Sequence, residues 1–313
     1  MTAIRTEGLS KRYGDVVALD GLDLSIEEGS VFGFLGPNGA GKTTTIKLLT
    51  GLSQPTSGRA WVAGEEVTQQ AVSFKSKIGY LPDVPGFYTW MTGREYLFFS
   101  GEISGLSPLE NNKRCDELLE LVELKNTARR KVGGYSRGMR QRLGIAQALV
   151  GRPQVLFMDE PTSALDPVGR REVLELIGRL KREATIFMST HILSDVERVC
   201  DTLGIIDQGR LVTVATVEEL RQRYAPSVIE LQFDEDTAPL LSLLQGQSWL
   251  ETVEIVTSNG LSAIRIKAID VAAAKAELPR LMADSGLSLN RYEVMMPSLE
   301  DIFAELVSGG GGL

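Results

Sequence analysis

The chain has little cysteine and histidine. Cys115 and Cys200 are its two cysteines, and His191 is the one histidine among 313 residues. The cysteines lie far apart and belong to no paired motif, so the spacings that predict a zinc site or a disulfide framework are missing. Two buried or half-buried thiols in a reducing compartment are the simplest interpretation.

Long apolar runs are also missing. No stretch approaches the roughly 18 residues that cross a bilayer as a helix. The first residues, Met1 to Gly8, lack the basic and then apolar layout of a signal peptide and are typical of a strand. We therefore expect a cytoplasmic protein that is attached to the cytoplasmic face of a membrane only through a partner subunit.

Positive charge is in short supply. The chain carries 33 Lys and Arg against 41 Asp and Glu, which gives a net charge of −8. Such a chain has no bulk attraction to nucleic acid, so we expect no nucleic-acid partner. Its 43% of hydrophobic and 24% of charged residues are ordinary for a globular protein.

The pattern along the chain indicates several kinds of structure. Polar and apolar residues alternate over 1–30 around a turn at Tyr13, which predicts antiparallel strands. Helical periodicity dominates 85–150. Continuous apolar runs separated by helical stretches predict a parallel sheet that is covered on both faces. These runs are Val31–Leu35, Val155–Met158, Thr185–Met188 and Leu203–Ile206.

A second domain is expected after a boundary near Tyr224 and Pro226. The remaining sequence predicts strand, helix, strand, strand, helix, strand and a final helix, which is the split-βαβ pattern of a ferredoxin-like domain. We predict a first domain over 1–222, with a helical subdomain at about 85–150. We further predict an accessory domain over 226–308 and a disordered tail over 309–313.

A glycine-rich segment carries the clearest chemical signal. Gly36 to Thr43 fits the pattern G-x-x-x-x-G-K-[ST], preceded by an apolar strand and followed by a helix. Its backbone N–H groups can wrap a phosphate, Lys42 can reach the β- and γ-phosphates, and Thr43 can ligate Mg²⁺. The predicted nucleotide-binding residues here are Gly36, Asn38, Gly39, Ala40, Gly41, Lys42, Thr43 and Thr44.

Two carboxylates end a buried strand further along. Asp159 is placed to hold Mg²⁺ at the carboxyl edge of a sheet. Glu160 follows it and can polarise a water against the γ-phosphate. An acidic pair after a strand is by itself often a solvated loop, and the preceding phosphate loop favours the catalytic interpretation.

A third segment begins a helix at Ser136. The serine is a good N-cap residue, and Gly138 allows a close approach of the backbone. A helix N-terminus of this kind is also an anion site.

The order of these three segments resembles the nucleotide-binding subunits of ABC transporters. Their signature motif L-S-G-G-Q corresponds here to Tyr135–Met139, with Ser136 and Gly138 kept. The resemblance implies an α/β P-loop NTPase core with an antiparallel β subdomain and a helical signature subdomain. It implies that the chain hydrolyses ATP with Mg²⁺, and that Lys42, Glu160 and His191 are catalytic.

Further residues are assigned by the same resemblance. Tyr13 matches the residue that stacks on adenine, although a turn tyrosine in a hairpin is the alternative. Asp166 belongs to the D-loop, and His191 matches the switch histidine, although a lone histidine is often structural. Asp83 stands where the family usually has a glutamine, and its carboxylate can ligate Mg²⁺ or a water.

The resemblance also implies partners. Each ATP is held between the phosphate loop of one subunit and the signature of another, so a second nucleotide-binding subunit, expected to be an identical copy, is required. A transmembrane permease is expected to dock near Phe87, Tyr88 and Trp90, although these aromatics can instead pack in their own core. The end Pro297–Phe303 resembles subunits of drug and antibiotic exporters and of copper-linked nitrous-oxide systems, which favours export.

Two alternatives remain open at this point. A soluble ABC-type ATPase, for example one of iron–sulfur assembly, shares the same motifs without a membrane partner. A small nucleotide-regulated switch or kinase shares only the phosphate loop, and the segment at Ser136 argues against it.

Overall fold

The chain divides into two units in a computed structural model that describes residues 1–68, 73–163, 165–223, 228–234, 237–258, 261–295 and 298–309. One unit is Met1–Val217 with the chain from Leu306 onward, and the other is Glu218–Glu305. Each is described by itself. Tyr224 and Pro226 lie outside the described residues, so the domain boundary near them stays a prediction.

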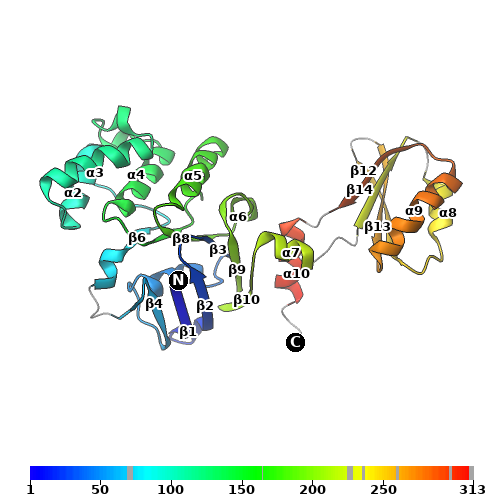
Figure 1. Ribbon diagram of the computed structural model, residues 1–313, viewed down its shortest axis with the longest axis horizontal. Coiled ribbons are helices and arrows are strands. Elements are labelled where there is room, and N and C mark those ends of the chain that lie inside the picture. The colour runs from blue at the N-terminus through cyan, green and yellow to red at the C-terminus, as the bar shows by residue number, and fades with distance from the viewer. Residues whose placement is uncertain are drawn as a thin grey trace. The chain divides into compact units, whose positions relative to one another are not determined.

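A six-stranded sheet forms the centre of the first unit (Figure 1). Its order is β10-β9-β3-β8-β7-β6, and every neighbouring pair is parallel except β10 with β9. Every residue of β3, β7 and β8 is buried, as expected for strands covered on both faces. The predicted parallel sheet is therefore confirmed. Its strands are β3 (Val31–Leu35), β6 (Ile78–Leu81), β7 (Val155–Asp159), β8 (Thr185–Thr190), β9 (Thr202–Asp207) and β10 (Arg210–Ala215).

A four-stranded antiparallel sheet packs beside it in the order β2-β1-β4-β5. The long hairpin of β1 and β2 turns at Gly14, whose φ of 58° is easily adopted only by glycine. One hydrophobic core joins the two sheets, and it includes Ile4, Phe34, Ile46 and Phe187. The elements are β1 (Thr2–Tyr13), β2 (Val16–Glu27), β4 (Ser57–Val62), β5 (Glu65–Glu66) and the helix α1 (Lys42–Leu49).

Helices cover the other face of the central sheet. Their core brings together Leu97, Leu118, Leu143 and Leu176 with Met158 of the sheet. Capping boxes start α2 and α3, because Thr92 and Ser107 each exchange hydrogen bonds with a glutamate three residues on. The helices of the unit are α2 (Gly93–Ile103), α3 (Pro108–Leu121), α4 (Arg137–Leu149), α5 (Pro167–Leu180) and α6 (Leu193–Val199). The helix α7 (Val217–Arg223) begins at Val217, and its remaining residues are assigned to the second unit.

The second unit has the predicted ferredoxin-like topology. Its antiparallel sheet has the order β12-β13-β11-β14, so the first strand of the sequence lies inside and pairs with the third and fourth. Ile229, Leu231 and Phe233 point from β11 into a core shared with α8 and α9. The elements are β11 (Val228–Phe233), α8 (Ala238–Leu244), β12 (Leu250–Ser258), β13 (Leu261–Ala268), α9 (Val271–Ser285), β14 (Leu289–Met295) and α10 (Leu299–Gly309), of which the residues from Leu306 are assigned to the first unit.

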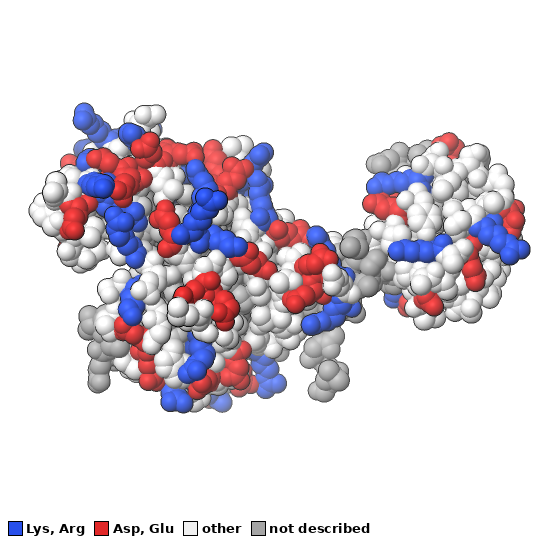
Figure 2. Space-filling model, viewed as in Figure 1, with Lys and Arg blue, Asp and Glu red and all other residues white. Residues whose placement is uncertain are grey.

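The surface carries both signs of charge. Figure 2 shows Lys and Arg side chains interspersed with Asp and Glu on the visible face. No helix within the described ranges has the length and apolar character needed to cross a membrane. The predicted tail begins at Gly309, which the structure instead has as the last residue of α10, and residues 310–313 lie outside these ranges.

Candidate active site

The candidate site lies at one edge of the central sheet. Gly36 follows β3, Glu160 follows β7, His191 follows β8 and Asp83 follows β6 at a distance of two residues. Because these strands are parallel, their carboxyl ends meet at the same edge, where open α/β sheets bind their ligands. Residues that are distant in the sequence are thereby gathered in one place.

The loop from Gly36 to Gly41 depends on backbone that only glycine supplies. A Cβ at Gly36 would lie 2.3 Å from the carbonyl oxygen of Ile206. Gly41 has a φ of 109°, and a Cβ there would lie 2.5 Å from the carbonyl oxygen of Ala18. No side chain caps α1, so the first N–H groups of this helix remain available to an anion.

Lys42 is held at the centre of this loop. Its side chain is 6% exposed, and its Nζ donates to the carbonyl oxygens of Gly36 at 2.7 Å and Pro37 at 3.2 Å. The same Nζ lies 3.3 Å from Glu160 Oε1. A buried ammonium needs such partners, and an incoming phosphate oxygen has to compete with them.

Asp159 forms a second cluster of oxygen atoms. It is 2% exposed, and its Oδ1 accepts hydrogen bonds from Thr43 Oγ1 at 3.2 Å and Ser189 Oγ at 2.6 Å. Carboxylate and hydroxyl oxygens are the donors that Mg²⁺ prefers, and Mg²⁺ needs few of them from a protein. The described part of the chain has no group of three or more His, Cys, Asp or Glu side chains that could hold a metal ion.

Sequence reasoning missed Ser189. Besides bonding Asp159, its hydroxyl and its carbonyl oxygen each accept the backbone N–H of Glu160 at 3.1 Å. Ser189 therefore fixes both carboxylates. A signal was present in the sequence, since this polar residue follows the apolar run Ile186–Met188 and lies two residues before His191, but its partners are identified only by the pairing of β7 with β8.

Glu160 sits in an unusual backbone conformation. Its φ of 48° is in the left-handed region, which costs a non-glycine residue about 1 kcal/mol or more. Its side chain is 13% exposed, and Oε2 lies 2.9 Å from Nδ1 of His191, whose other ring nitrogen makes no hydrogen bond to the described residues. Glu160 thus joins Lys42 to His191 at the mouth of the loop.

Four predicted binding residues are not part of this cluster. Tyr13 is 48% exposed at the end of β1, with Lys11 Nζ 4.9 Å from its ring centroid. Ser136 caps α4 by accepting the N–H of Met139 at 3.2 Å, and a Cβ at Gly138 would meet nothing within 4 Å. Asp166 caps α5 through the N–H of Gly169.

Asp83 makes a contact that the sequence did not predict. Its Oδ1 accepts a hydrogen bond from Ser163 Oγ at 2.8 Å. Burial raises the pKa of the neighbouring Tyr80 phenol, and the charges of Asp159 and Asp83 raise it further. Ligation of Mg²⁺ by Asp83 therefore stays a prediction beside this observed bond.

The aromatic segment after Asp83 is divided between the interior and the surface. Phe87 packs edge-on against Tyr96 with ring centroids 5.0 Å apart. Tyr88 and Trp90 are 50% and 65% exposed, and their ring centroids lie 6.0 Å apart with the planes tilted by 42°. Phe87 thus belongs to the core of the helical region, whereas Tyr88 and Trp90 form an exposed apolar pair.

The cysteines have no place at the site. Cys115 is buried and Cys200 is half-buried, and both thiols are free, as the sequence indicated. Burial raises the pKa of Cys115 to about 11 and that of Cys200 still further. Both therefore remain protonated and unreactive near neutral pH.

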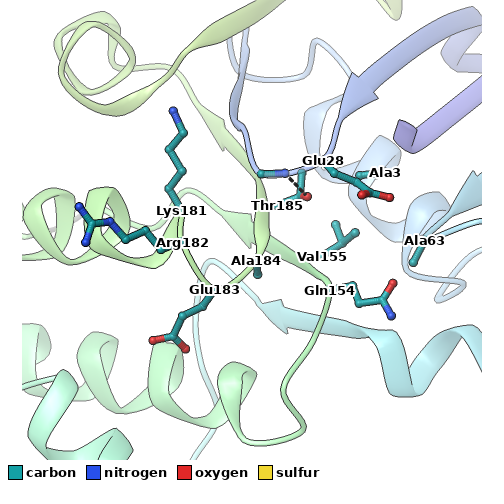
Figure 3. A pocket seen from close by; sticks show the side chains of 11 residues that line it. Ala3, Glu28, Ala63, Gln154, Val155, Lys181, Arg182, Glu183, Ala184 and Thr185 are labelled. Carbon is teal, nitrogen blue, oxygen red and sulfur yellow. Dashed lines mark hydrogen bonds between the residues drawn. The ribbon is translucent and has the colours of Figure 1, made fainter. Parts of the chain in front are cut away.

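Another cavity lies at the opposite edge of the sheet (Figure 3). Its volume is about 270 Å³, and Val155 and Thr185 in its wall are the first residues of β7 and β8. Lys181, Arg182 and Glu183 point in different directions around it rather than toward a common point. This cavity has no converging set of polar groups.

Comparisons with known proteins agree with this geometry. A family profile described as ABC transporter matches residues 19–163, and one described as the C-terminal domain of ATP-binding proteins like DrrA1-3 matches residues 216–307. The uncharacterized ABC transporter ATP-binding protein YxlF of Bacillus subtilis (strain 168) is 39% identical over 96% of this chain and 98% of its own length. The bacitracin transport ATP-binding protein BcrA of Bacillus licheniformis is 37% identical over 99% and 98%. A solved structure of an ABC transporter ATP-binding subunit matches with a TM-score of 0.64 at 30% identity, over 71% of this chain and 93% of that one.

Proposed function

The chain belongs to the ATP-binding proteins of ABC transporters, and on that premise we propose that it hydrolyses ATP beside Glu160 and so powers a membrane-spanning partner. The observation that carries the proposal is the Glu160 carboxylate, which lies 3.3 Å from Lys42 Nζ and 2.9 Å from His191 Nδ1. A carboxylate at the head of a phosphate loop is placed to take the proton of an attacking water.

The phosphates bind along the loop and the start of α1. The N–H groups from Gly39 to Thr44 and the Asn38 side chain surround them, and the helix N-terminus favours negative charge. Lys42 exchanges its carbonyl partners and Glu160 for oxygens of the β- and γ-phosphates. This exchange frees the Glu160 carboxylate for a water molecule.

Thr43 and Asp159 fit Mg²⁺, because both present hard oxygen atoms at the same point and Ser189 orients the carboxylate. When bound there, Mg²⁺ neutralises charge on the phosphate oxygens.

Hydrolysis then proceeds by attack of water on the γ-phosphorus. The new P–O bond forms as the bond to the bridging oxygen of ADP breaks, and the proton of the water passes to Glu160. His191 holds the Glu160 carboxylate through Nδ1, and its other nitrogen is directed to the γ-phosphate. Lys42 stabilises the charge that develops on the equatorial oxygens.

The site needs a second cassette to be complete. Ser136 and Gly138 of one subunit are proposed to face the γ-phosphate bound by the other, with Asp166 at the same interface. Their separation from the Lys42 cluster supports this, because α4 presents an N-terminus with an open glycine. Tyr13 supplies the exposed ring on which adenine stacks. An identical copy of the chain satisfies all of these requirements.

The membrane partner is proposed to dock at the exposed pair of Tyr88 and Trp90. Aromatic side chains are typical anchors of protein interfaces, and this pair is more than half exposed on average. Docking there places the chain at the cytoplasmic face of the membrane. Export is the proposed direction, since a full-length relative is named for bacitracin transport. The relatives give no support to the soluble alternative.

Reconstitution with the partner tests this proposal. The chain is purified from its native membranes, and a co-purifying protein with several membrane spans is expected. The pair in vesicles should hydrolyse ATP and move substrate, and Trp90→Ala should uncouple the two while leaving ATP affinity unchanged. Recovery of the chain with only soluble partners would contradict the transport function and leave the ATPase standing.

A further inference from the structure

The turn that carries Glu160 is held from three sides. The Glu160 N–H is fixed by Ser189, as described above. Thr162 bonds the fully buried Asp195, which also accepts Arg170 Nε at 2.6 Å. At the end of the turn, the N–H of Ser163 donates to the carbonyl oxygen of Glu160 at 3.1 Å. A left-handed residue persists only where its surroundings over-determine it, so each of these contacts bears on Glu160.

Asp83 contacts the turn at its last residue, Ser163. Its carboxylate accepts the Ser163 hydroxyl at 2.8 Å, which links the end of β6 to the turn after β7 across 80 residues of sequence. A charged acceptor makes a stronger hydrogen bond than the amide oxygen of a glutamine. Neither Asp83 nor Ser163 makes another side-chain hydrogen bond or ion pair within the described part of the chain. Removing either side chain therefore leaves the other without a side-chain partner there.

We propose that Asp83 is a positioning residue, which fixes the Glu160 turn through the Ser163 hydroxyl. The inference rests on the proposed function, because it assumes that Glu160 accepts the proton of the attacking water. A misplaced base lowers the rate of the chemical step without weakening the binding of ATP.

The surroundings of the pair support this assignment. Asp83 and Ser163 line one cavity of about 460 Å³, together with Arg137 and Arg140 of α4. The Asp83 carboxylate and the Ser163 hydroxyl therefore share this cavity with two cationic side chains. Val84 and Pro85, which follow Asp83 in the sequence, line the same cavity.

The first experiment compares Asp83→Ala, Ser163→Ala and the double variant in the full-length chain. Each single variant should lower kcat about tenfold at unchanged KM for ATP, the effect of losing one charge-assisted hydrogen bond. The double variant should lose no more than either single one, because both remove the same bond. Additive losses, or an unchanged kcat in Ser163→Ala, overturn the proposal.

Controls separate positioning from other roles. Asp83→Asn keeps an acceptor oxygen and should retain kcat within about threefold, which excludes general loss of folding. Asp116→Ala removes an exposed ion pair with Arg94 and should change nothing. Thermal melting without nucleotide should show that all variants are folded at the assay temperature.

A titration with Mg²⁺ distinguishes the competing role of Asp83. If Asp83 ligates the cation, Asp83→Ala raises the Mg²⁺ concentration needed for tight ATP binding, whereas Ser163→Ala does not, and that result overturns the proposal. Positioning predicts the same Mg²⁺ dependence of ATP binding in both variants.

The Glu160→Gln variant is measured in parallel. If it hydrolyses ATP at the normal rate, the proposed function of Glu160 is wrong. If it is inactive while Asp83→Ala has normal activity, only the positioning role of Asp83 is wrong.

Discussion

Glu160 in the first unit and Glu230 in the second are both largely shielded from water, with side chains 13% and 6% exposed, and both contact a cation. Glu230 lies within the regular strand β11 and accepts Arg265 Nε at 2.8 Å and Gln232 Nε2 at 3.1 Å. Glu160 follows a strand in a left-handed conformation and contacts Lys42 and His191.

The difference lies in what the partners can exchange. Arg265 reaches Glu230 from the adjacent strand β13, where the pairing register fixes the two residues opposite each other. Lys42 and His191 reach Glu160 from the start of α1 and from the residue after β8, where the proposed function has a phosphate take the place of these contacts. On that proposal, a buried carboxylate is structural when regular backbone supplies its partner, and reactive when its partners also bind substrate.

The largest expected effect is the loss of ATP hydrolysis when Glu160 is replaced. Glu160→Gln should lower kcat about 10³-fold, because the base that accepts the proton is lost, while ATP still binds and holds two subunits together. Steady-state hydrolysis and size-exclusion chromatography with ATP measure the two parts. Glu230→Gln is the matched control and should leave kcat unchanged. Normal turnover in Glu160→Gln would refute the assignment of the base.

A second, smaller effect is a rise in KM for ATP when an aromatic ring of the first unit is removed, compared with a tyrosine of the second unit. Tyr13→Ala should raise KM for ATP about tenfold, since one stacked base is lost, whereas Tyr13→Phe keeps the ring and the affinity. Tyr292→Phe removes a half-buried hydroxyl of the second unit and should not alter KM. An unchanged KM in Tyr13→Ala would favour a purely structural tyrosine in the hairpin turn.

Removal of the cation beside Glu230 should change stability rather than catalysis. Arg265→Met leaves the carboxylate without its ion pair and should cost about 1 kcal/mol, a modest amount because Arg265 itself is 44% exposed and solvent screens the pair. Denaturant unfolding followed at Trp249, which is buried in this unit, measures the loss. The rate of ATP hydrolysis should be equal to that of the unmodified chain.

The smallest effect is a dependence of stability on pH in the second unit. The hydrogen bond from Arg265 lowers the pKa of Glu230 below its usual value. The folded carboxyl therefore stabilises the unit fully above the ordinary glutamate pKa of about 4.3, and the contribution disappears as the pH falls through the lower folded value. The difference in unfolding free energy between the unmodified chain and Glu230→Gln should shrink on acidification. A constant difference from pH 7 to pH 3 would argue against this origin.

Local patterns predicted much of the fold. The order of strands and helices predicted after the domain boundary is the order of β11, α8, β12, β13, α9, β14 and α10 in the structure, because the hydrophobic period of a half-buried element is visible in its own sequence. The loop from Gly36 to Gly41 was predictable for a related reason. The backbone conformation of the loop requires glycine at these positions, so the motif can be recognised without knowledge of distant residues.

Contacts between residues that are distant in the sequence could not be predicted from it. The bond of Ser163 with Asp83 depends on which strands become neighbours, and so do the bonds of Ser189 with both carboxylates. Alternation along β7 does not set the direction of Glu160 either, because its backbone leaves the strand conformation. The capping of α5 by Asp166 could have been predicted, because the sequence Asp-Pro-Val-Gly places a good N-cap residue directly before a proline at the first helical position. The sequence analysis assigned Asp166 only to the interface.

The left-handed backbone at Glu160 has a consequence for how this chain changes under selection. Glycine adopts that conformation freely, so Glu160→Gly removes backbone strain at the same position where it removes the proposed proton acceptor. The same change also takes the carboxylate away from the buried Lys42 ammonium, 3.3 Å distant, and that loss opposes the gain from relieved strain. A charge partner, as well as the demand for ATP turnover, therefore keeps a glutamate at this strained position.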